Sequence, residues 1–239
     1  MEDAMKKIVF GMLFFIAVIF SAFTGDAAVF KDIGFSSDGR VYMFGEYGKT
    51  DKTFCGWAVI YTVDVVKNDF VKGEVYKTNP TSATNGKSGR EVYDALVAKN
   101  YAVTKKYNCV ETVPEHVLYI CSDETKRGTD QIVFKDFAGT LGSAATYCID
   151  LVPTVSGNGK NARSSFYIML EKRDEHGSVV SRQKIGSPDI VRKGVTDYRI
   201  EKIFCDRLGT SLIFVISKTM EDDTGVLIRY MVEAARVER

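Results

Sequence analysis

The side chains with the greatest catalytic potential in this chain are its two histidines, His116 and His176. Both lie in segments whose composition is typical of turns. A Ser-His-Asp site needs a histidine that a third group holds rigidly, and a solvated turn does not hold a side chain in this way. The chain also lacks the Gly-x-Ser-x-Gly motif that presents a nucleophilic serine. We therefore interpret both histidines as solvated turn residues and assign no catalytic residue.

Five cysteines form the second group of reactive side chains. None lies in a Cys-x-x-Cys pair, so zinc binding and thioredoxin-like redox chemistry have no support. In an oxidising compartment, the odd number leaves at least one thiol free or paired between chains. Alternatively, these residues are small buried hydrophobes. We assign no metal ligand and no cofactor to the set, which comprises Cys55, Cys109, Cys121, Cys148 and Cys205.

One disulfide can be placed from a predicted hairpin over residues 107–121. Its two strands flank the turn Pro114-Glu115-His116. Residues that lie symmetrically about Glu115 would face each other, and Cys109 would then face Cys121. Such pairs have Cβ atoms ~4.5–5.5 Å apart, and the closer kind approaches disulfide reach. A register slip of one residue would put the two thiols on opposite faces of the hairpin, so the bond depends on this register.

Three short motifs resemble known sites without matching them. Ser181 and Lys184 have the Ser-x-x-Lys spacing of penicillin-binding enzymes, but they lie in a predicted strand and lack the partner motifs. Gly86-Lys87-Ser88 resembles the end of a phosphate loop without its first glycine, and only a generic anion site at a helix N-terminus remains. Glu221-Asp222-Asp223 lacks the spacing of a calcium loop and is interpreted as a solvated acidic loop.

The composition places these residues in a folded globular protein. The chain has 239 residues, of which 45% are hydrophobic and 26% charged, with a formal net charge of +1. A disordered chain would have fewer apolar residues and a larger net charge. A nucleic-acid-binding protein usually has a basic excess, so no nucleic-acid partner is expected.

Residues 1–27 have the features of a secretory signal peptide. Lys6 and Lys7 precede an apolar run, and Gly25 and Ala27 provide the small residues required before a cleavage site between Ala27 and Ala28. The alternative is an uncleaved anchor, but the apolar run over residues 8–23 is short for a membrane span of ~20 residues. The mature chain has no further segment that could span a membrane, and we predict a periplasmic or secreted location.

The mature chain is predicted to be all-β and mostly antiparallel, as one β-rich domain over residues 28–239. Short strands separated by turn residues are typical of a propeller-like arrangement or a two-sheet sandwich. One helix is predicted at residues 88–99, in a loop-helix insertion near residues 78–100, because Ser88 and Glu91 form a capping-box pattern. The predicted strands lie within 35–47, 57–66, 70–76, 107–113, 117–121, 131–137, 144–152, 165–173, 178–185, 198–205, 211–217 and 226–234.

Two regions of the sequence suggest an internal repeat. Residues 33–44 and 203–214 align with their turn glycines and their final phenylalanines close to register. Each region begins a predicted meander of three strands, and such a unit must stack on another to bury its face. Alternatively, the likeness is only that of any two β-meanders. If the repeat is structural, the two meanders should adopt similar conformations.

The ordered segments around the first turn resemble a known family. They are Phe35-Ser36-Ser37-Asp38-Gly39-Arg40, Phe44-Gly45-Glu46-Tyr47-Gly48, Ile60-Tyr61-Thr62-Val63-Asp64-Val65 and Asn68-Asp69-Phe70-Val71-Lys72-Gly73. Together they resemble the bacterial family of predicted secreted proteins numbered 2259 among the domains of unknown function. The first segment alone also resembles blades of TolB-like propellers. The family resemblance implies secretion and a β-rich fold, and it assigns no catalytic residue.

These observations favour an uncharacterised exported protein with a non-catalytic binding or scaffold role in the bacterial envelope. Its partner would be an unknown envelope protein or a glycan. The alternative is a secreted hydrolase or carbohydrate-active enzyme that uses paired carboxylates. A glycosidase needs two carboxyl groups at a set separation, and only the three-dimensional structure shows such a pair.

Overall fold

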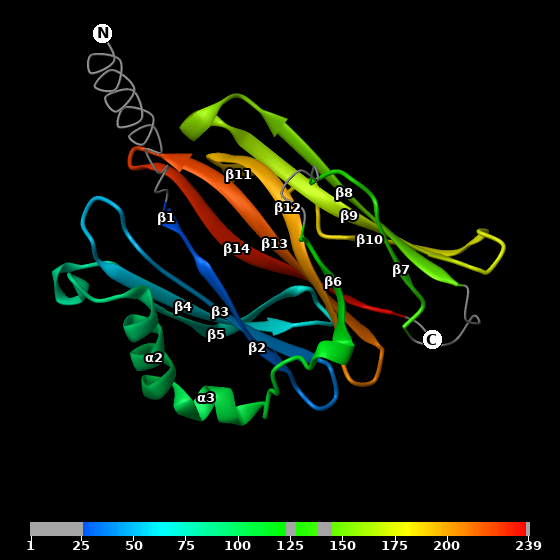
Figure 1. Cartoon of the computed structure of the whole chain (residues 1–239), viewed down its shortest axis with the longest axis horizontal. Helices are drawn as coiled ribbons and strands as arrows, with labels where there is room; N and C mark the ends of the chain where they lie inside the picture. The colour runs from blue at the N-terminus through cyan, green and yellow to red at the C-terminus, as the bar shows by residue number, and fades with distance from the viewer. Residues whose placement is uncertain (1–25, 123–127, 138–144, 238–239) are drawn as a thin grey trace, which may run out of the picture.

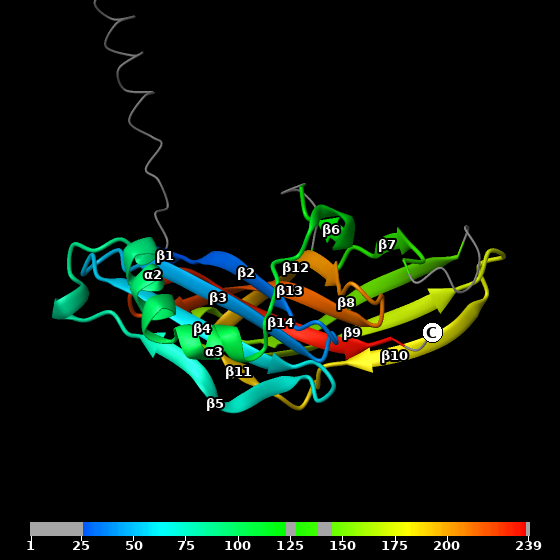
Figure 2. The same ribbon diagram turned by 90° about the horizontal axis from the view of Figure 1, so that it is seen from below.

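The computed structural model describes residues 26–122, 128–137 and 145–237. These residues form three β-sheets that stack in layers, with helices on the outer face of the first sheet (Figures 1 and 2). All strand pairs are antiparallel except one. The prediction of an all-β, mostly antiparallel fold is therefore confirmed.

The first sheet has four strands in the order β2-β3-β4-β5. Alternate residues of β3 point to opposite faces, so Tyr42 and Phe44 pack toward the central sheet while Met43 packs toward a helix. The strands are β2 (Val29–Phe35), β3 (Val41–Lys49), β4 (Gly56–Asp64) and β5 (Asp69–Thr78).

The central sheet has five strands in the order β1-β14-β13-β12-β6. Ile213 and Val215 of β13 pack against the first sheet, whereas Leu212, Phe214 and Ile216 pack against the third. A strand that is buried on both faces reads as a continuous apolar run, and Leu-Ile-Phe-Val-Ile is such a run. The strands are β1 (Asp26–Ala27), β6 (Val117–Ile120), β12 (Val195–Cys205), β13 (Ser211–Asp222) and β14 (Gly225–Arg236).

The third sheet has the order β10-β9-β8-β7, and β11 also pairs with β9. Its buried face, which includes Tyr147, Ile149, Phe166 and Ile168, shares one hydrophobic cluster with the central sheet. A turn of 3-10 helix, η3 (Gly159–Asn161), joins β8 to β9. The strands are β7 (Ile132–Lys135), β8 (Thr146–Ser156), β9 (Arg163–Arg173), β10 (Val179–Ile185) and β11 (Arg192–Lys193).

This layering has one sheet more than the predicted two-sheet sandwich, and its sheets stack rather than radiate as propeller blades do. The reason lies in the central sheet. Both faces of β13 are apolar, so this sheet needs a partner sheet on each side to keep its side chains from water. The sequence shows the apolar run of β13, but it does not show which strands cover each face.

The predicted mid-chain helix is α2 (Gly89–Lys99), with Ser88 as its N-cap. Ser88 and Glu91 form the predicted capping box, in which Glu91 N donates to Ser88 Oγ and Ser88 N donates to the Glu91 carboxylate. Val92 and Leu96 of this helix pack on the first sheet. A short 3-10 turn, η1 (Ser82–Thr84), precedes the helix, and a second short helix that was not predicted, α3 (Tyr101–Lys106), follows it.

The predicted hairpin at residues 107–121 is wrong. Its tip is instead a 3-10 turn, η2 (Pro114–His116), and the two flanking segments do not pair with each other. Val110 forms a bridge with Phe35 of β2, whereas β6 pairs with β12. The segments separate because each finds a free edge of a different sheet. The register that would face Cys109 with Cys121 is therefore absent from the structure.

The two meanders of the suspected repeat, β2-β3-β4 and β12-β13-β14, share strand order and turn geometry. The first turn spans residues 36–39 and the second spans residues 206–209. Gly39 and Gly209 both have positive φ, 66° and 62°. Gly39 N donates to Ser36 O over 2.9 Å, and Gly209 N donates to Asp206 O over 3.0 Å. The predicted similarity is confirmed for the turns, although the strand bulges lie at positions that are not equivalent.

The first residues that the structure describes link two sheets. Asp26 and Ala27 form β1, which runs parallel to β14 and covers its edge. Ala28 N then donates to Ile228 O over 3.0 Å, after which the chain crosses to the first sheet as β2. Two residues that the predicted cleavage would remove are therefore part of the central sheet.

Candidate functional site

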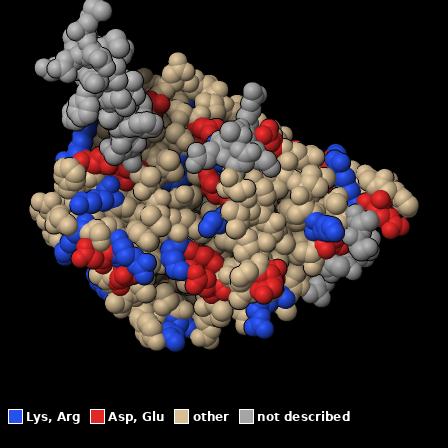
Figure 3. Space-filling view, in the orientation of Figure 1, with Lys and Arg blue, Asp and Glu red and all other residues tan. Residues whose placement is uncertain are grey.

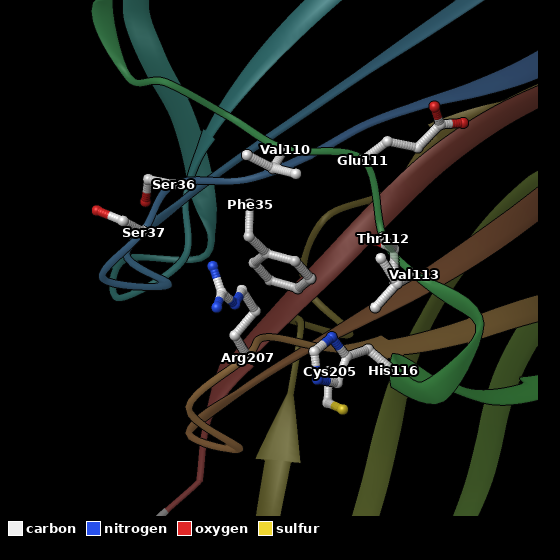
Figure 4. Close-up of a pocket in the computed structure, with 10 residues that line it drawn as sticks. All are labelled: Phe35, Ser36, Ser37, Val110, Glu111, Thr112, Val113, His116, Cys205 and Arg207. Atoms are coloured by element: carbon white, nitrogen blue, oxygen red, sulfur yellow. The ribbon is translucent and has the colours of Figure 1, made fainter.

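A cavity of about 320 Å³ lies where the first turn, the second turn and the segment 110–116 meet (Figure 4). Because the two turns belong to different sheets, the cavity sits at the junction of the first and central layers. The lining residues come from all three segments. They are Phe35, Ser36, Ser37, Val110, Glu111, Thr112, Val113, His116, Cys205 and Arg207.

Hydrogen bonds hold in place the two turns that border this cavity. Ser211 Oγ donates to Gly39 O over 2.8 Å, and the Asp206 carboxylate accepts from Thr210 N and Ser211 N, both over 2.7 Å. A Cβ atom added to Gly39 would lie 2.2 Å from Asp206 Oδ2, so only glycine fits at this contact. The two turns that border the cavity are therefore fixed by hydrogen bonds between side chains and backbone.

The segment 110–116 is attached to β2 by hydrogen bonds. Val110 N donates to Phe35 O over 2.9 Å, and Phe35 N donates to Val110 O over 3.2 Å. Thr112 N donates to Asp32 Oδ2 over 2.8 Å. Glu111 points away from the other lining side chains (Figure 4), and its carboxylate pairs with Lys31. The segment thus forms a wall whose acidic group is directed elsewhere.

The cavity combines an apolar floor with a cationic rim. Phe35 is 7% exposed and Cys205 is buried, whereas Val110 and Val113 of the wall are 61% and 43% exposed. Arg207 lies exposed on the rim, and it has no ion pair within the described part of the chain.

One polar atom at the cavity lacks a partner. Thr112 Oγ1 is buried, and no hydrogen bond reaches it from any residue that the structure describes. A buried hydroxyl without a partner is costly, but this atom is closed to solvent and so does not face a ligand directly. The accessible lining offers an apolar surface and, at Arg207, a site for an anion.

Cys205 and His116 line the same cavity, a combination that the sequence does not reveal because they are far apart in the chain. Burial raises the pKa of the Cys205 thiol to about 12. The nucleophilic form of cysteine is the thiolate, which is scarce at neutral pH when the pKa is this high. The chemistry of this pair therefore favours binding over nucleophilic catalysis.

The sequence of this chain matches one known protein family. The model of one protein family matches residues 43–236, and the family is described as "Predicted secreted protein (DUF2259)". This chain belongs to the DUF2259 family. The resemblance inferred from the sequence is thus confirmed. A search of curated proteins found no match.

The family match also bears on location. The DUF2259 family is described as predicted secreted, which supports export of this protein. Within the described residues, no helix combines the length and hydropathy needed to cross a membrane. On the face shown in Figure 3, basic and acidic side chains are interspersed rather than gathered by sign. The match begins at Met43, so it includes the second turn and the segment 110–116 but not the first turn.

This DUF2259 protein has a second cavity, of about 430 Å³, between the β4–β5 turn, the loop after β10 and β14. Glu233 lines it, and burial raises the pKa of this carboxyl group. Asn68 Nδ2 donates to Glu233 Oε2, and Arg192 Nη2 lies 3.9 Å from Glu233 Oε1. Asp69 lines the same cavity. The hydrolase alternative requires two carboxyl groups at one site. Glu233 and Asp69 are two carboxyl groups that line this cavity.

The structure places the histidines differently from each other. His176 lies exposed in the turn between β9 and β10, as predicted. His116 is half-buried at the end of η2 and lines the first cavity, so the prediction of a solvated turn residue is wrong there. The difference arises because residues 114–116 pack against the central sheet instead of forming a hairpin tip.

The three short motifs of the sequence do not form sites. Ser181 and Lys184 lie in β10, and a strand does not present them as one helical turn would. The N-terminus of α2 already has a carboxylate, that of Glu91, in its capping box. In the acidic loop, Asp222 accepts from Thr224 and Asp223 pairs with Lys160. No group of three or more His, Cys, Asp or Glu residues in the described chain is placed to hold a metal ion.

Proposed function

We propose that this exported protein is a non-catalytic binding or scaffold protein of the bacterial envelope, which acts outside the cytoplasm through the cavity between its two turns. The observation that carries this proposal is the combination of an apolar floor with Arg207, a cation without an ion pair among the described residues. Cavities lined by apolar side chains with a few converging polar groups are the usual form of ligand sites.

The lining residues define the chemistry of the ligand. An apolar side chain would cover Phe35 and Val113, and an adjoining carboxylate would pair with Arg207. Arginine binds carboxylates through two parallel hydrogen bonds, which fixes the orientation of the bound group. A hydrophobic residue next to an acidic group, as at the carboxyl end of a peptide, has both features.

Of the two partners considered from the sequence, an envelope protein agrees with this chemistry better than a glycan does. Tyrosine and tryptophan combine a broad apolar face with a polar group, and they bury large areas against a partner. The cavity contains neither of these residues, and its single phenylalanine, Phe35, is largely covered by its neighbours. A sugar would therefore find little aromatic surface here.

The test is capture of an envelope protein by the immobilised mature protein. Arg207→Gln and Val113→Asp should each reduce capture at least ~10-fold, because a lost charge-assisted bond or a charge in an apolar site costs about 1.5–3 kcal/mol. Arg163→Gln, which alters an exposed arginine of the third sheet, should leave capture unchanged. Equal capture by all four proteins would contradict the proposal.

The hydrolase alternative rests on the second cavity, where Glu233 and Asp69 both line the wall. A carboxyl group with a raised pKa is suited to the role of general acid. If this alternative is correct, Glu233→Gln should abolish the release of reducing sugar from envelope glycan, while Glu175→Gln, an exposed site on another turn, should have no effect. No release by the wild-type protein would contradict it.

A further inference from the structure

A group of two buried carboxylates and two half-buried cations lies along the edge of β14, where β1 leaves the central sheet. Arg229 Nη2 is 2.6 Å from Asp26 Oδ2, and Arg229 Nη1 donates to Asp26 O over 2.7 Å. The guanidinium lies 4.3 Å from the ring centroid of Trp57. Asp26 is only 5% exposed, so its carboxylate is a buried partner of Arg229.

A second cation and a second carboxylate complete this group. Lys218 lies opposite Arg229 in the register of β13 and β14, and like charges in such positions destabilise a sheet. Glu46 is 4% exposed, and its carboxylate accepts from Tyr61 Oη over 2.9 Å and from Tyr230 N over 2.8 Å. Burial lowers the pKa of Lys218, and the charge of Glu46 opposes this effect. The charges of these four side chains balance only while both carboxylates are present, and Arg192 adds a further positive charge near Lys218.

Cleavage between Ala27 and Ala28 would upset this balance. It would remove Asp26 and would convert Ala28 N, which is 3.0 Å from Ile228 O at the same edge, into a terminal ammonium group. With an ordinary α-amino pKa of ~7.7–8.0, this group is mostly charged at neutral pH. Arg229, Lys218 and the new ammonium group would then remain with only one carboxylate of the group, that of Glu46, and Arg229 would lose its ion-pair partner. Removing one partner of a buried or half-buried ion pair is destabilising. The edge of β14 would also lose β1.

We propose that the mature chain retains Asp26, so that signal peptidase hydrolyses a bond before Asp26 rather than the bond after Ala27. Water is the co-reactant, and the products are the carboxylate of the leader and the amino group of the mature chain. Ala22 and Thr24 place small residues at the third and first positions before the bond between Thr24 and Gly25. Signal peptidase acts on the extended precursor, before the fold forms. The charge balance therefore does not direct the cut; it identifies which mature chain is stable once folded.

The first test is the intact mass of the wild-type protein recovered from the extracytoplasmic fraction. We expect a mass that begins at Gly25, and any start from residue 21 to residue 26 supports retention of Asp26. A mature protein that begins at Ala28 would overturn the proposal. Retained Met1 would overturn its cleavage step.

The second test follows residue 26 through export of the full-length precursor. Asp26→Asn should lower the melting temperature of the mature protein by roughly 10 °C, because it leaves the half-buried Arg229 without its counter-ion. The control Asp223→Asn removes an aspartate whose side chain is 84% exposed and should change the melting temperature by ~1 °C or less. If Asp26→Asn yields a mature protein with the mass and melting temperature of the wild type, residue 26 has been removed and the proposal is wrong.

Discussion

The first turn and the second turn use the same backbone geometry in opposite environments. Both have a glycine at positive φ and matching hydrogen bonds across the strand ends. The first turn begins with Ser36, and Ser37 and Asp38 beside it are exposed. The second turn begins with Asp206, which is only 2% exposed. The turn conformation is therefore the same in both environments. The type of residue that accepts from the nearby N–H groups differs with burial.

The reason for the different first residues is access to water. In the first turn, Val41 N donates to Ser36 Oγ over 3.0 Å, and solvent can satisfy the remaining groups. In the second turn, Ser211 is buried, and the Asp206 carboxylate accepts two backbone N–H groups. A hydrogen bond to a charged group is stronger than one to a hydroxyl, and leaving a buried donor without a partner is costly.

The largest difference between the two turns is expected from Asp206→Ala. The substitution removes the acceptor for Thr210 N and Ser211 N, and we expect a loss of ~3 kcal/mol in the free energy of unfolding. Urea denaturation of the mature protein measures it. The matched change in the first turn, Ser36→Ala, should cost far less. A loss below ~1 kcal/mol for Asp206→Ala would show that burial does not set the role of this carboxylate.

Gly39→Ala tests the contact between the two turns. The new Cβ would lie 2.2 Å from Asp206 Oδ2, and alanine at positive φ is strained as well. We expect a loss of ~2–3 kcal/mol in the free energy of unfolding. Gly177→Ala is the control, because Gly177 also has positive φ but no atom lies within 4 Å of its added Cβ. The control should cost only ~1 kcal/mol, and equal losses would argue against the contact.

Ser36→Ala tests the hydrogen bonds of the exposed turn. It removes the hydroxyl that accepts from Val41 N and donates to Asp38 Oδ1. Water can replace these bonds in part, so we expect a loss of ~1 kcal/mol in the free energy of unfolding by urea denaturation. Ser37→Ala, a neighbouring exposed position, serves as the control. A loss as large as that of Asp206→Ala would make the two turns energetically equivalent.

The smallest expected effect is the pH response of Asp38. The hydrogen bond from Ser36 Oγ, followed by that from Arg40 N, lowers the pKa of this carboxyl group. A depressed pKa contributes stability that is present above the unfolded pKa of ~3.9 and is lost as the pH falls through the folded pKa. Because Asp38 is exposed, we expect only ~0.3 kcal/mol after solvent screening. Urea midpoints below pH ~4 should fall less steeply for Asp38→Asn; an identical slope would contradict this.

Much of the local structure could be predicted from the sequence. The capping box of Ser88 and Glu91 correctly located the start of α2, because both partners lie within one helical turn. The strands of the two meanders and their turn glycines were also predicted, because alternation and turn chemistry are local properties. The first cavity was not predicted, because its residues come from three segments that meet only when two sheets stack.

The sequence alone is enough to predict the all-β class, the meanders, the turns and the resemblance to a secreted family. The tertiary structure was needed to decide that residues 107–121 separate into a bridge with β2 and a strand beside β12, and that His116 therefore lines a cavity. It also decided that Asp26 pairs with Arg229 across more than two hundred residues of chain. The physical reason is that strands can pair with any free edge. The choice among edges depends on the summed burial of whole sheets, which no local pattern contains.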